Sequence, residues 1–274
     1  MPDPSSSPAR PSRRPALVAS DLDGTLLRSD GTLSDRSVAA IADCEAAGAV
    51  VVLATGRPPR WITHIGEALG HAGTAVCANG AIVYDLADER VLSSSTIDLA
   101  AARDIVLRVR RGWPDAVFAV ETIDHLGLEP AWKVNFEPPA GTRFADALEL
   151  VEVPAVKILA RLVGHPEESA MRAAAAELDG LAEVTWSGGS GLLEMSAPGV
   201  TKALALAGLA GRLGVAASAA VAFGDMPNDL DMLRWAGRGF AVANAHRSVL
   251  EAADEVVGSN DDDGVAAALE VLFG

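Results

Sequence analysis

Short runs of Val, Ala and Leu alternate along the chain with stretches that carry apolar residues at helical spacing. Runs that are apolar throughout are typical of parallel strands covered on both faces, and their alternation with helices predicts β-α-β units. Ser34 and Gly48 stand where a helix is expected to begin and to end. In the first part of the chain, we expect strands at residues 16–20, 49–55 and 74–79, and helices at 35–47 and 61–69.

The alternation of apolar strands with helices stops after residue 80. In residues 81–97, apolar and polar residues alternate on both sides of a polar turn, which predicts a hairpin. The elements expected next are a helix at 99–111, a strand at 116–121, a polar irregular stretch at 122–144, a strand at 156–163, a helix at 166–178 and a strand at 182–186. This mixture of helices and strands predicts a smaller α+β unit inserted into the first.

The alternation of apolar strands with helices resumes near residue 190. Residues 191–196 lead to a helix that begins near 199, followed by strands at 219–224 and 239–243 and helices at 228–237 and 263–273. We therefore predict an α/β fold with a doubly wound, Rossmann-like parallel sheet of order 3-2-1-4-5 and an inserted α+β domain. The expected domains are a disordered tail at 1–15, a core at 16–84 and 189–274, and the inserted domain at 85–188.

The composition and charge of the chain argue against some classes of function. The chain has 274 residues, of which 50% are hydrophobic, and its formal net charge is -15. This acidity argues against binding to nucleic acid or to a membrane surface. No apolar stretch approaches the ~18 residues of a membrane span. Cys44 and Cys77 lie in apolar elements without metal-site spacing, so we expect buried, reduced thiols and a cytoplasmic protein.

Two acidic segments are predicted to meet. Asp21 and Asp23 follow the first strand, and Asp225 follows the strand at 219–224. In the expected strand order these strands are neighbours, and ligands of such sheets bind at the carboxyl ends of the strands where the order reverses. Thr55 and Arg57 stand at the end of the adjacent strand, 49–55, and are expected at the same edge of the sheet. Because close carboxylates repel one another, they need a compensating cation or a shifted pKa, and Mg²⁺, which prefers such oxygen ligands, is the candidate cation.

Four motifs carry a family resemblance. In order, "DLDGTLL", "LATGR", "GVTK" and "GDMPNDLDML" resemble the motifs of the haloacid dehalogenase superfamily, and the long insertion resembles the large cap of its Cof-type branch. The resemblance covers nearly the whole chain from about residue 15. It implies a Mg²⁺-dependent phosphatase that hydrolyses a small phosphorylated metabolite. Sugar phosphates are the leading class, and phosphorylated cofactors such as flavin mononucleotide or pyridoxal phosphate are the alternative.

The resemblance also implies roles for single residues. Asp21 would be the nucleophile that forms an aspartyl-phosphate, and Asp23 the general acid and base. Thr55 would donate a hydrogen bond to a phosphoryl oxygen, and Lys202 would offset negative charge on the nucleophile and the phosphate. An aspartate at position 23 favours phosphoryl chemistry, because dehalogenases of the superfamily lack it.

Further residues of the motifs are expected to bind metal and substrate. Asp225 would bind Mg²⁺ with the Asp21 carboxylate and the Asp23 backbone carbonyl. Asp229 would orient the waters of the metal or Lys202, and Asn228 would contact metal, water or phosphate. The residues expected to contact substrate or phosphate are Gly56, Arg57, Asn79 and Asn228. In the inserted domain, four side chains either face the cleft or serve packing and surface roles: His125, Glu129, Trp132 and Lys133.

Two alternatives share this core. A phosphomutase, or another phosphotransferase, would pass the phosphoryl group to a sugar instead of to water. A non-catalytic protein that binds a phosphorylated ligand would use the same fold without turnover. In each case the partner is a small phosphorylated metabolite, with no nucleic acid and no membrane, and the chain is a monomer or a homodimer.

Overall fold

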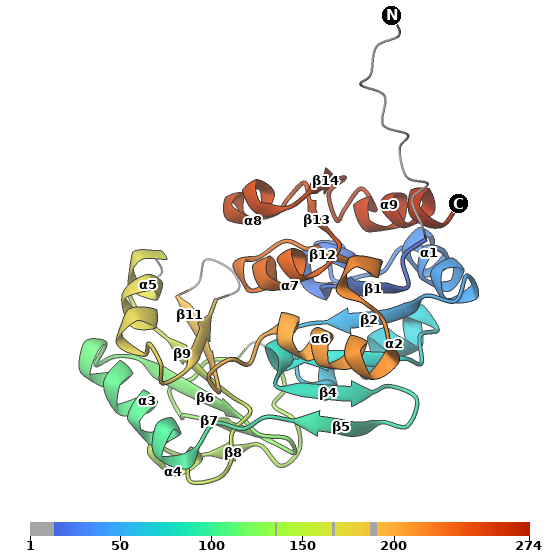
Figure 1. The fold of residues 1–274 in the computed structure, drawn as a ribbon. Coiled ribbons are helices and arrows are strands. Elements are labelled where there is room, and N and C mark those ends of the chain that lie inside the picture. The colour runs from blue at the N-terminus through green and yellow to red at the C-terminus, as the bar shows by residue number, and fades with distance from the viewer. Residues whose placement is uncertain (1–13, 135, 166–167, 187–190) are drawn as a thin grey trace, which may run out of the picture.

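The computed structural model describes residues 14–134, 136–165, 168–186 and 191–274. Its strands form two sheets, one of eight strands and one of six, which lie side by side (Figure 1). Residues 1–13 of the predicted disordered tail lie outside the described residues. Within the described ranges, none of the helices combines the length and the apolar character that crossing a membrane requires.

The eight-stranded sheet confirms the predicted doubly wound order. Its strands are arranged as β14-β13-β12-β1-β2-β3-β4-β5, which is the expected order with one more strand at one edge and a hairpin at the other. Pairing is parallel from β14 to β3 and antiparallel from β3 to β5. The strands are β1 (Leu17–Ser20), β2 (Val50–Ala54), β3 (Thr74–Cys77), β4 (Ile82–Asp85), β5 (Arg90–Ser94), β12 (Ala220–Gly224), β13 (Arg238–Val242) and β14 (Glu255–Val257).

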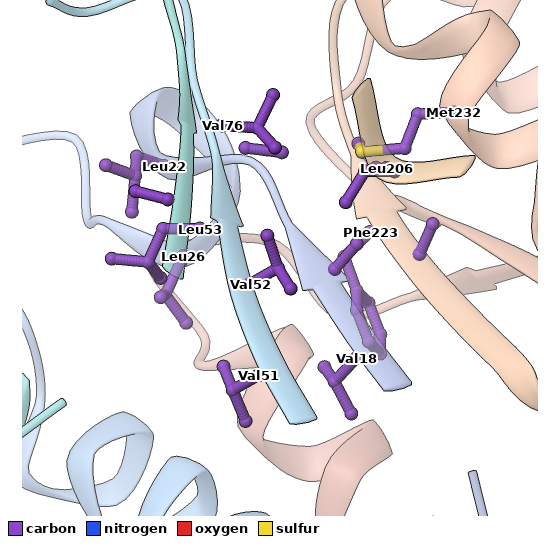
Figure 2. Close-up of a cluster of buried hydrophobic side chains, with 14 of the residues drawn as sticks. Val18, Leu22, Leu26, Val51, Val52, Leu53, Val76, Leu206, Phe223 and Met232 are labelled. Carbon is purple, nitrogen blue, oxygen red and sulfur yellow. The ribbon is translucent and has the colours of Figure 1, made fainter. Parts of the chain in front are cut away.

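The central strands of this sheet are buried on both faces by helices. Figure 2 shows Val52 of β2 on the side of Leu206 and Met232, which belong to two of these helices, and Val51 and Leu53 on the other side. The apolar runs of the sequence therefore reflect two-sided burial. The helices around this sheet are α1 (Asp35–Ala46), α2 (Thr63–Leu69), α6 (Lys202–Leu213), α7 (Leu230–Trp235), α8 (Arg247–Ala252) and α9 (Gly264–Phe273).

The six-stranded sheet has the order β10-β11-β9-β6-β7-β8 and carries helices on one face. Phe118, Ile158 and Leu193 point from its strands into the apolar core beneath these helices. Its strands are β6 (Val117–Glu121), β7 (Leu126–Leu128), β8 (Arg143–Phe144), β9 (Lys157–Arg161), β10 (Glu183–Thr185) and β11 (Leu192–Ser196). Its helices are α3 (Leu99–Gly112), α4 (Ala147–Leu150) and α5 (Glu168–Glu177).

The strands of the smaller sheet do not coincide with the inserted domain expected at residues 85–188. β5 extends the larger sheet, because the predicted hairpin pairs back onto β3 through β4. β11, which was expected to lead the chain back into the core, pairs with β9 and β10 in the smaller sheet. The stretch expected to be irregular, residues 122–144, contains β7 and β8. The chain thus enters the smaller unit after β5 and leaves it after β11.

Candidate active site

The two acidic segments meet at the carboxyl ends of β1 and β12. These strands pair in parallel, and the Asp21 backbone N–H donates to the Phe223 carbonyl at 3.0 Å. Side-chain oxygens of Asp21, Asp225 and Asp229 all lie within 4.8 Å of one another. This geometry confirms the predicted meeting of the two segments.

The turn after β1 is shaped around Asp225. Gly24 has a φ of +76°, and a Cβ at this position would lie 2.5 Å from Oδ2 of Asp225. Any larger residue would therefore be strained in its backbone and would press on the carboxylate. The next residue, Thr25, donates from Oγ1 to Oδ1 of Asp225 at 3.1 Å. Sequence and backbone together hold this carboxylate at the strand end.

Lys202 joins the carboxylates from the first turn of α6. The side chain of Thr201 caps this helix by accepting a hydrogen bond from the Leu204 N–H. Lys202 is 1% exposed, and its Nζ donates to Oδ1 of Asp21 and to Oδ1 of Asp229, each at 2.6 Å.

Asp229 is held by the backbone as well as by Lys202. Its second oxygen, Oδ2, accepts from the backbone N–H groups of Asp225 and Met226, each at 3.0 Å. Because both of its oxygens are engaged, Asp229 positions Lys202 and the loop after β12. The carboxylates of Asp21 and Asp225 are the ones best placed to hold a cation.

The site has more negative than positive charge. Burial, together with the charges of Asp229 and Asp225, raises the pKa of Asp21 well above its usual range despite the nearby Lys202. Burial and the charge of Asp229 raise the pKa of Asp225 to about 6. Burial alone would lower the pKa of Lys202, but the charges of Asp21 and Asp229 outweigh it and raise that pKa, so the ammonium stays charged. Three carboxylates facing one ammonium create a demand for a further cation.

The loop after β2 brings a second cation to the rim. The Arg57 guanidinium donates from Nε and Nη2 to the two oxygens of Asp23, at 2.8 and 2.5 Å. The backbone N–H of Arg57 donates to Oγ1 of buried Thr55 at 3.1 Å. Since a hydroxyl can accept and donate at the same time, the proton of the Thr55 hydroxyl remains for another acceptor. Arg57, expected to contact substrate, thus also pairs with Asp23.

Asn79 links the two sheets, and Asn228 in turn binds Asn79. Asn79 donates from Nδ2 to Oε2 of Glu194 at 2.6 Å and to Oγ1 of Thr185 at 3.2 Å. Asn228 donates to Oδ1 of Asn79 at 3.2 Å. Among the described residues, Oδ1 of Asn228 is a buried oxygen without a hydrogen-bond partner. An acceptor of this kind at the edge of a cavity fits a ligand, a water molecule or a metal-bound water.

The smaller sheet supplies side chains that sequence reasoning missed. Lys157 of β9 donates to the Gly56 carbonyl at 2.6 Å and to Oε2 of Glu194 at 3.1 Å. Glu121 of β6 accepts from both terminal nitrogens of Arg60 at 2.5 and 2.6 Å. The available signal was a charged residue at the end of a strand whose interior is apolar. These contacts fasten the smaller sheet over the strand ends of the larger one.

A cavity of about 290 Å³ lies between the two sheets. It is lined by Asp21, Asp23, Arg57, Asp225 and Asn228 from the larger unit, and by residues that include Lys157, Glu194, Trp132 and Lys133 from the smaller one. Of the four side chains left open in the sequence, Trp132 and Lys133 therefore face the cleft. Glu129 instead is buried and accepts from the Phe118 and Ala147 backbone N–H groups. His125 closes a turn with Thr122.

Comparison with known families adds an independent finding. A sequence profile of the haloacid dehalogenase-like hydrolases matches residues 18–269. The chain belongs to this family. This is the family that the four motifs resemble, and its match spans both sheets.

Relatives of known name within the family are similar over nearly their whole length. The 5-amino-6-(5-phospho-D-ribitylamino)uracil phosphatase YcsE of Bacillus subtilis is 28% identical over 257 residues, which cover 92% of this chain and 94% of that protein. The pyridoxal phosphate phosphatase YbhA of Escherichia coli is 28% identical over 264 residues, which cover 91% of this chain and 96% of that protein. A solved haloacid dehalogenase-like hydrolase from B. subtilis has a TM-score of 0.79 at 26% identity, covering 93% of this chain and 99% of that one.

Proposed function

We propose that the protein is a Mg²⁺-dependent phosphatase that hydrolyses a phosphate monoester of a small metabolite through an aspartyl-phosphate on Asp21. The observation that carries this proposal is the cluster of three buried aspartates, two of them bound to Lys202, which lies at the cavity between the two sheets. Relatives named as phosphatases of small phosphorylated compounds support the same reaction class.

The residues fit a magnesium ion. The groups that could bind the ion are carboxylate oxygens, which Mg²⁺ prefers. One buried ammonium does not balance the charge of three carboxylates. Gly24 has no Cβ, which leaves room beside Asp225. The carboxylates of Asp21 and Asp225 and the backbone carbonyl of Asp23 would hold the ion. When bound, Mg²⁺ would offset the charge of the phosphoryl oxygens during transfer.

The chain's own residues perform the transfer. A carboxylate oxygen of Asp21 attacks phosphorus, the bond from phosphorus to the alcohol oxygen breaks, and Asp23 protonates that oxygen. Asp23 then takes a proton from a water molecule, which attacks phosphorus, releases phosphate and restores Asp21. Lys202 and the Thr55 hydroxyl stabilise negative charge on the nucleophile and the phosphoryl oxygens. The smaller sheet acts as a cap that keeps bulk water out of the cleft.

The test of this function is phosphate release from a panel of sugar phosphates, nucleotides and phosphorylated cofactors, with Mg²⁺ and with excess chelator. Release that requires Mg²⁺ supports the proposal, whereas comparable rates in chelator contradict it. A phosphomutase would instead convert one phosphorylated compound into another without release of phosphate. A non-catalytic protein would bind a phosphorylated compound and leave it unchanged.

Replacing Asp23 by alanine is expected to lower kcat by ~10²–10⁴-fold, because the leaving oxygen loses its proton donor. The Asp23 side chain is 57% exposed, so the fold should tolerate the change. Steady-state kinetics of Asp23→Ala against Asp88→Ala, which removes an exposed aspartate from the β4–β5 hairpin, measures the effect. Equal kcat values for the two variants would remove Asp23 from the mechanism.

Stabilisation by Mg²⁺ is expected to depend on pH. A carboxyl group whose pKa is higher in the folded than in the unfolded state binds more protons when folded, so stability falls as pH rises between the two values. For Asp225, whose folded pKa is raised to about 6, the metal-free protein loses stability up to that pH. Mg²⁺ needs the deprotonated carboxylate and should restore stability above it.

The measurement is the shift in Tm on adding Mg²⁺, taken near pH 5 and near pH 7.5. We expect the larger shift at the higher pH. Asp225→Asn removes one of the two carboxylate ligands whose pKa is raised, so it should reduce the difference between the two values. Equal shifts at both pH values in the unaltered protein would contradict a metal site that includes Asp225.

A further inference from the structure

The face of the smaller sheet that points toward the larger one is divided into a charged part and an apolar part. Along each strand, successive side chains alternate between this face and the helix-covered face. The residues that line the cavity from this face include five apolar ones, called here the apolar wall: Ala119, Leu126, Leu128, Leu159 and Leu192. Ala119, Leu126 and Leu128 form a small apolar cluster separate from the core beneath the helices.

Aromatic rings border the apolar wall. Trp61, from the segment before α2, and Phe136, from the smaller unit, meet edge to face with ring centroids 5.3 Å apart, and both line the cavity. Trp132 packs against the apolar cluster on another side and lies beneath the Arg161 guanidinium, 4.6 Å from its ring centroid. The cavity is thus bordered by flat surfaces contributed by both units.

The charged side chains that the strands of this face carry into the cavity each bind a protein group. Glu121 binds Arg60, Lys157 binds the Gly56 carbonyl and Glu194, and Arg161 donates to the Lys133 carbonyl at 3.2 Å besides stacking on Trp132. These contacts join the sheets or shape the wall. The hydroxyl groups of a sugar would lose their water against the apolar wall without gaining comparable partners there, which is unfavourable.

From this wall we infer the substrate class: the cavity takes a phosphate monoester whose leaving alcohol carries a flat aromatic or heteroaromatic ring, with the ring on the apolar wall and the phosphate at Asp21. This inference rests on the proposed phosphatase function. A flat ring gains from burial against Leu and Ala and from edge or face contact with Trp and Phe. The cavity of about 290 Å³ suits a small ring system rather than a dinucleotide.

The test compares three esters that share a primary CH₂–O–phosphate linkage: benzyl phosphate, cyclohexylmethyl phosphate and glucose 6-phosphate. We expect kcat/KM for benzyl phosphate to exceed that for glucose 6-phosphate by about 10- to 100-fold. Cyclohexylmethyl phosphate, which is apolar but not flat, should fall between them. Glucose 6-phosphate as the best of the three would overturn the inference, and equal values for the two apolar esters would overturn the requirement for a flat ring.

Two variants and one control locate the effect. Trp132→Leu and Leu159→Gln change the border and the wall, and each should reduce the ratio of kcat/KM for benzyl phosphate to that for glucose 6-phosphate. Trp113→Leu removes a tryptophan that packs on the helix-covered core of the same unit and should keep the ratio. An unchanged ratio in both Trp132→Leu and Leu159→Gln would overturn the assignment of the wall to the leaving group.

Acetyl phosphate separates this inference from the function on which it rests. Its leaving group is too small to cover the apolar wall, so its hydrolysis reports on the chemistry at the strand ends. Hydrolysis of acetyl phosphate together with a preference for glucose 6-phosphate would reject only the aromatic substrate class. If neither acetyl phosphate nor any of the three esters releases phosphate, the proposed function and the inference both fail.

Discussion

Asp21→Asn is expected to lower phosphate release by a factor on the order of 10⁴ or more, because the amide cannot attack phosphorus. The substitution keeps the size of the side chain at a buried position beside Lys202. The loss should therefore appear in kcat under single-turnover and steady-state conditions alike. Circular dichroism and Tm would show that the fold is retained.

The matched control for this variant is Asp104→Asn. Asp104 forms an exposed pair with Arg108 on α3 and lies outside the cavity. We expect its kcat to equal that of the unaltered protein. If Asp21→Asn kept a comparable rate, or if Asp104→Asn lost as much, Asp21 would not be the nucleophile.

Lys202→Met is expected to abolish turnover and to lower the free energy of unfolding by ~3–5 kcal/mol. Methionine has a similar length but no charge, so Asp21, Asp225 and Asp229 would face one another without their ammonium. Removing one partner of a buried ionic cluster is costly because the remaining charges stay buried and uncompensated. Urea unfolding in the presence of chelator measures the loss.

Addition of Mg²⁺ distinguishes this electrostatic effect from poor packing. In Lys202→Met, a bound cation would offset part of the carboxylate charge, so Mg²⁺ should raise Tm more than it does in the unaltered protein. Arg234→Met removes a cation from an exposed pair with Asp231 and should change stability by less than ~0.5 kcal/mol. Equal stability of Lys202→Met and Arg234→Met would contradict the arrangement around Lys202.

The order of the larger sheet and the meeting of Asp21 with Asp225 were predictable from the sequence. Runs such as residues 49–55 are apolar throughout because their strands are covered on both faces, and few connection patterns suit such strands. Once β1 and β12 are neighbours, the residues that follow them must share one edge of the sheet. The motifs then supplied the remaining residues of the core site.

The limits of the inserted unit were not predictable in the same way. All residues of β5 are exposed, so its pattern resembles a loop or a separate unit, although it pairs with β4 at the edge of the larger sheet. The sequence of β11, with apolar residues interrupted by Glu194, suits either sheet. Only long-range pairing with β9 places it in the smaller one.

The side chains that the smaller sheet places at the site could not be predicted, because their positions depend on tertiary contacts and not on the spacing of residues in the sequence. Lys157 and Arg161 are the two charged ends of β9, and the position of Lys157 against the Gly56 carbonyl appears only when the two sheets face each other. The pairing of Arg57 with Asp23 likewise joins two motifs that were expected to serve separate roles. Neither contact could be read from the spacing of residues along the chain.

The proposed aspartyl-phosphate on Asp21 can be tested directly. The protein is mixed with a substrate and Mg²⁺, quenched in acid within a single turnover, digested and analysed by mass spectrometry. We expect a phosphorylated peptide that contains Asp21, formed and lost at rates consistent with kcat, and no such peptide from Asp21→Asn. An enzyme that turns over while the peptide stays unmodified at every time point would show that phosphate transfer does not pass through Asp21.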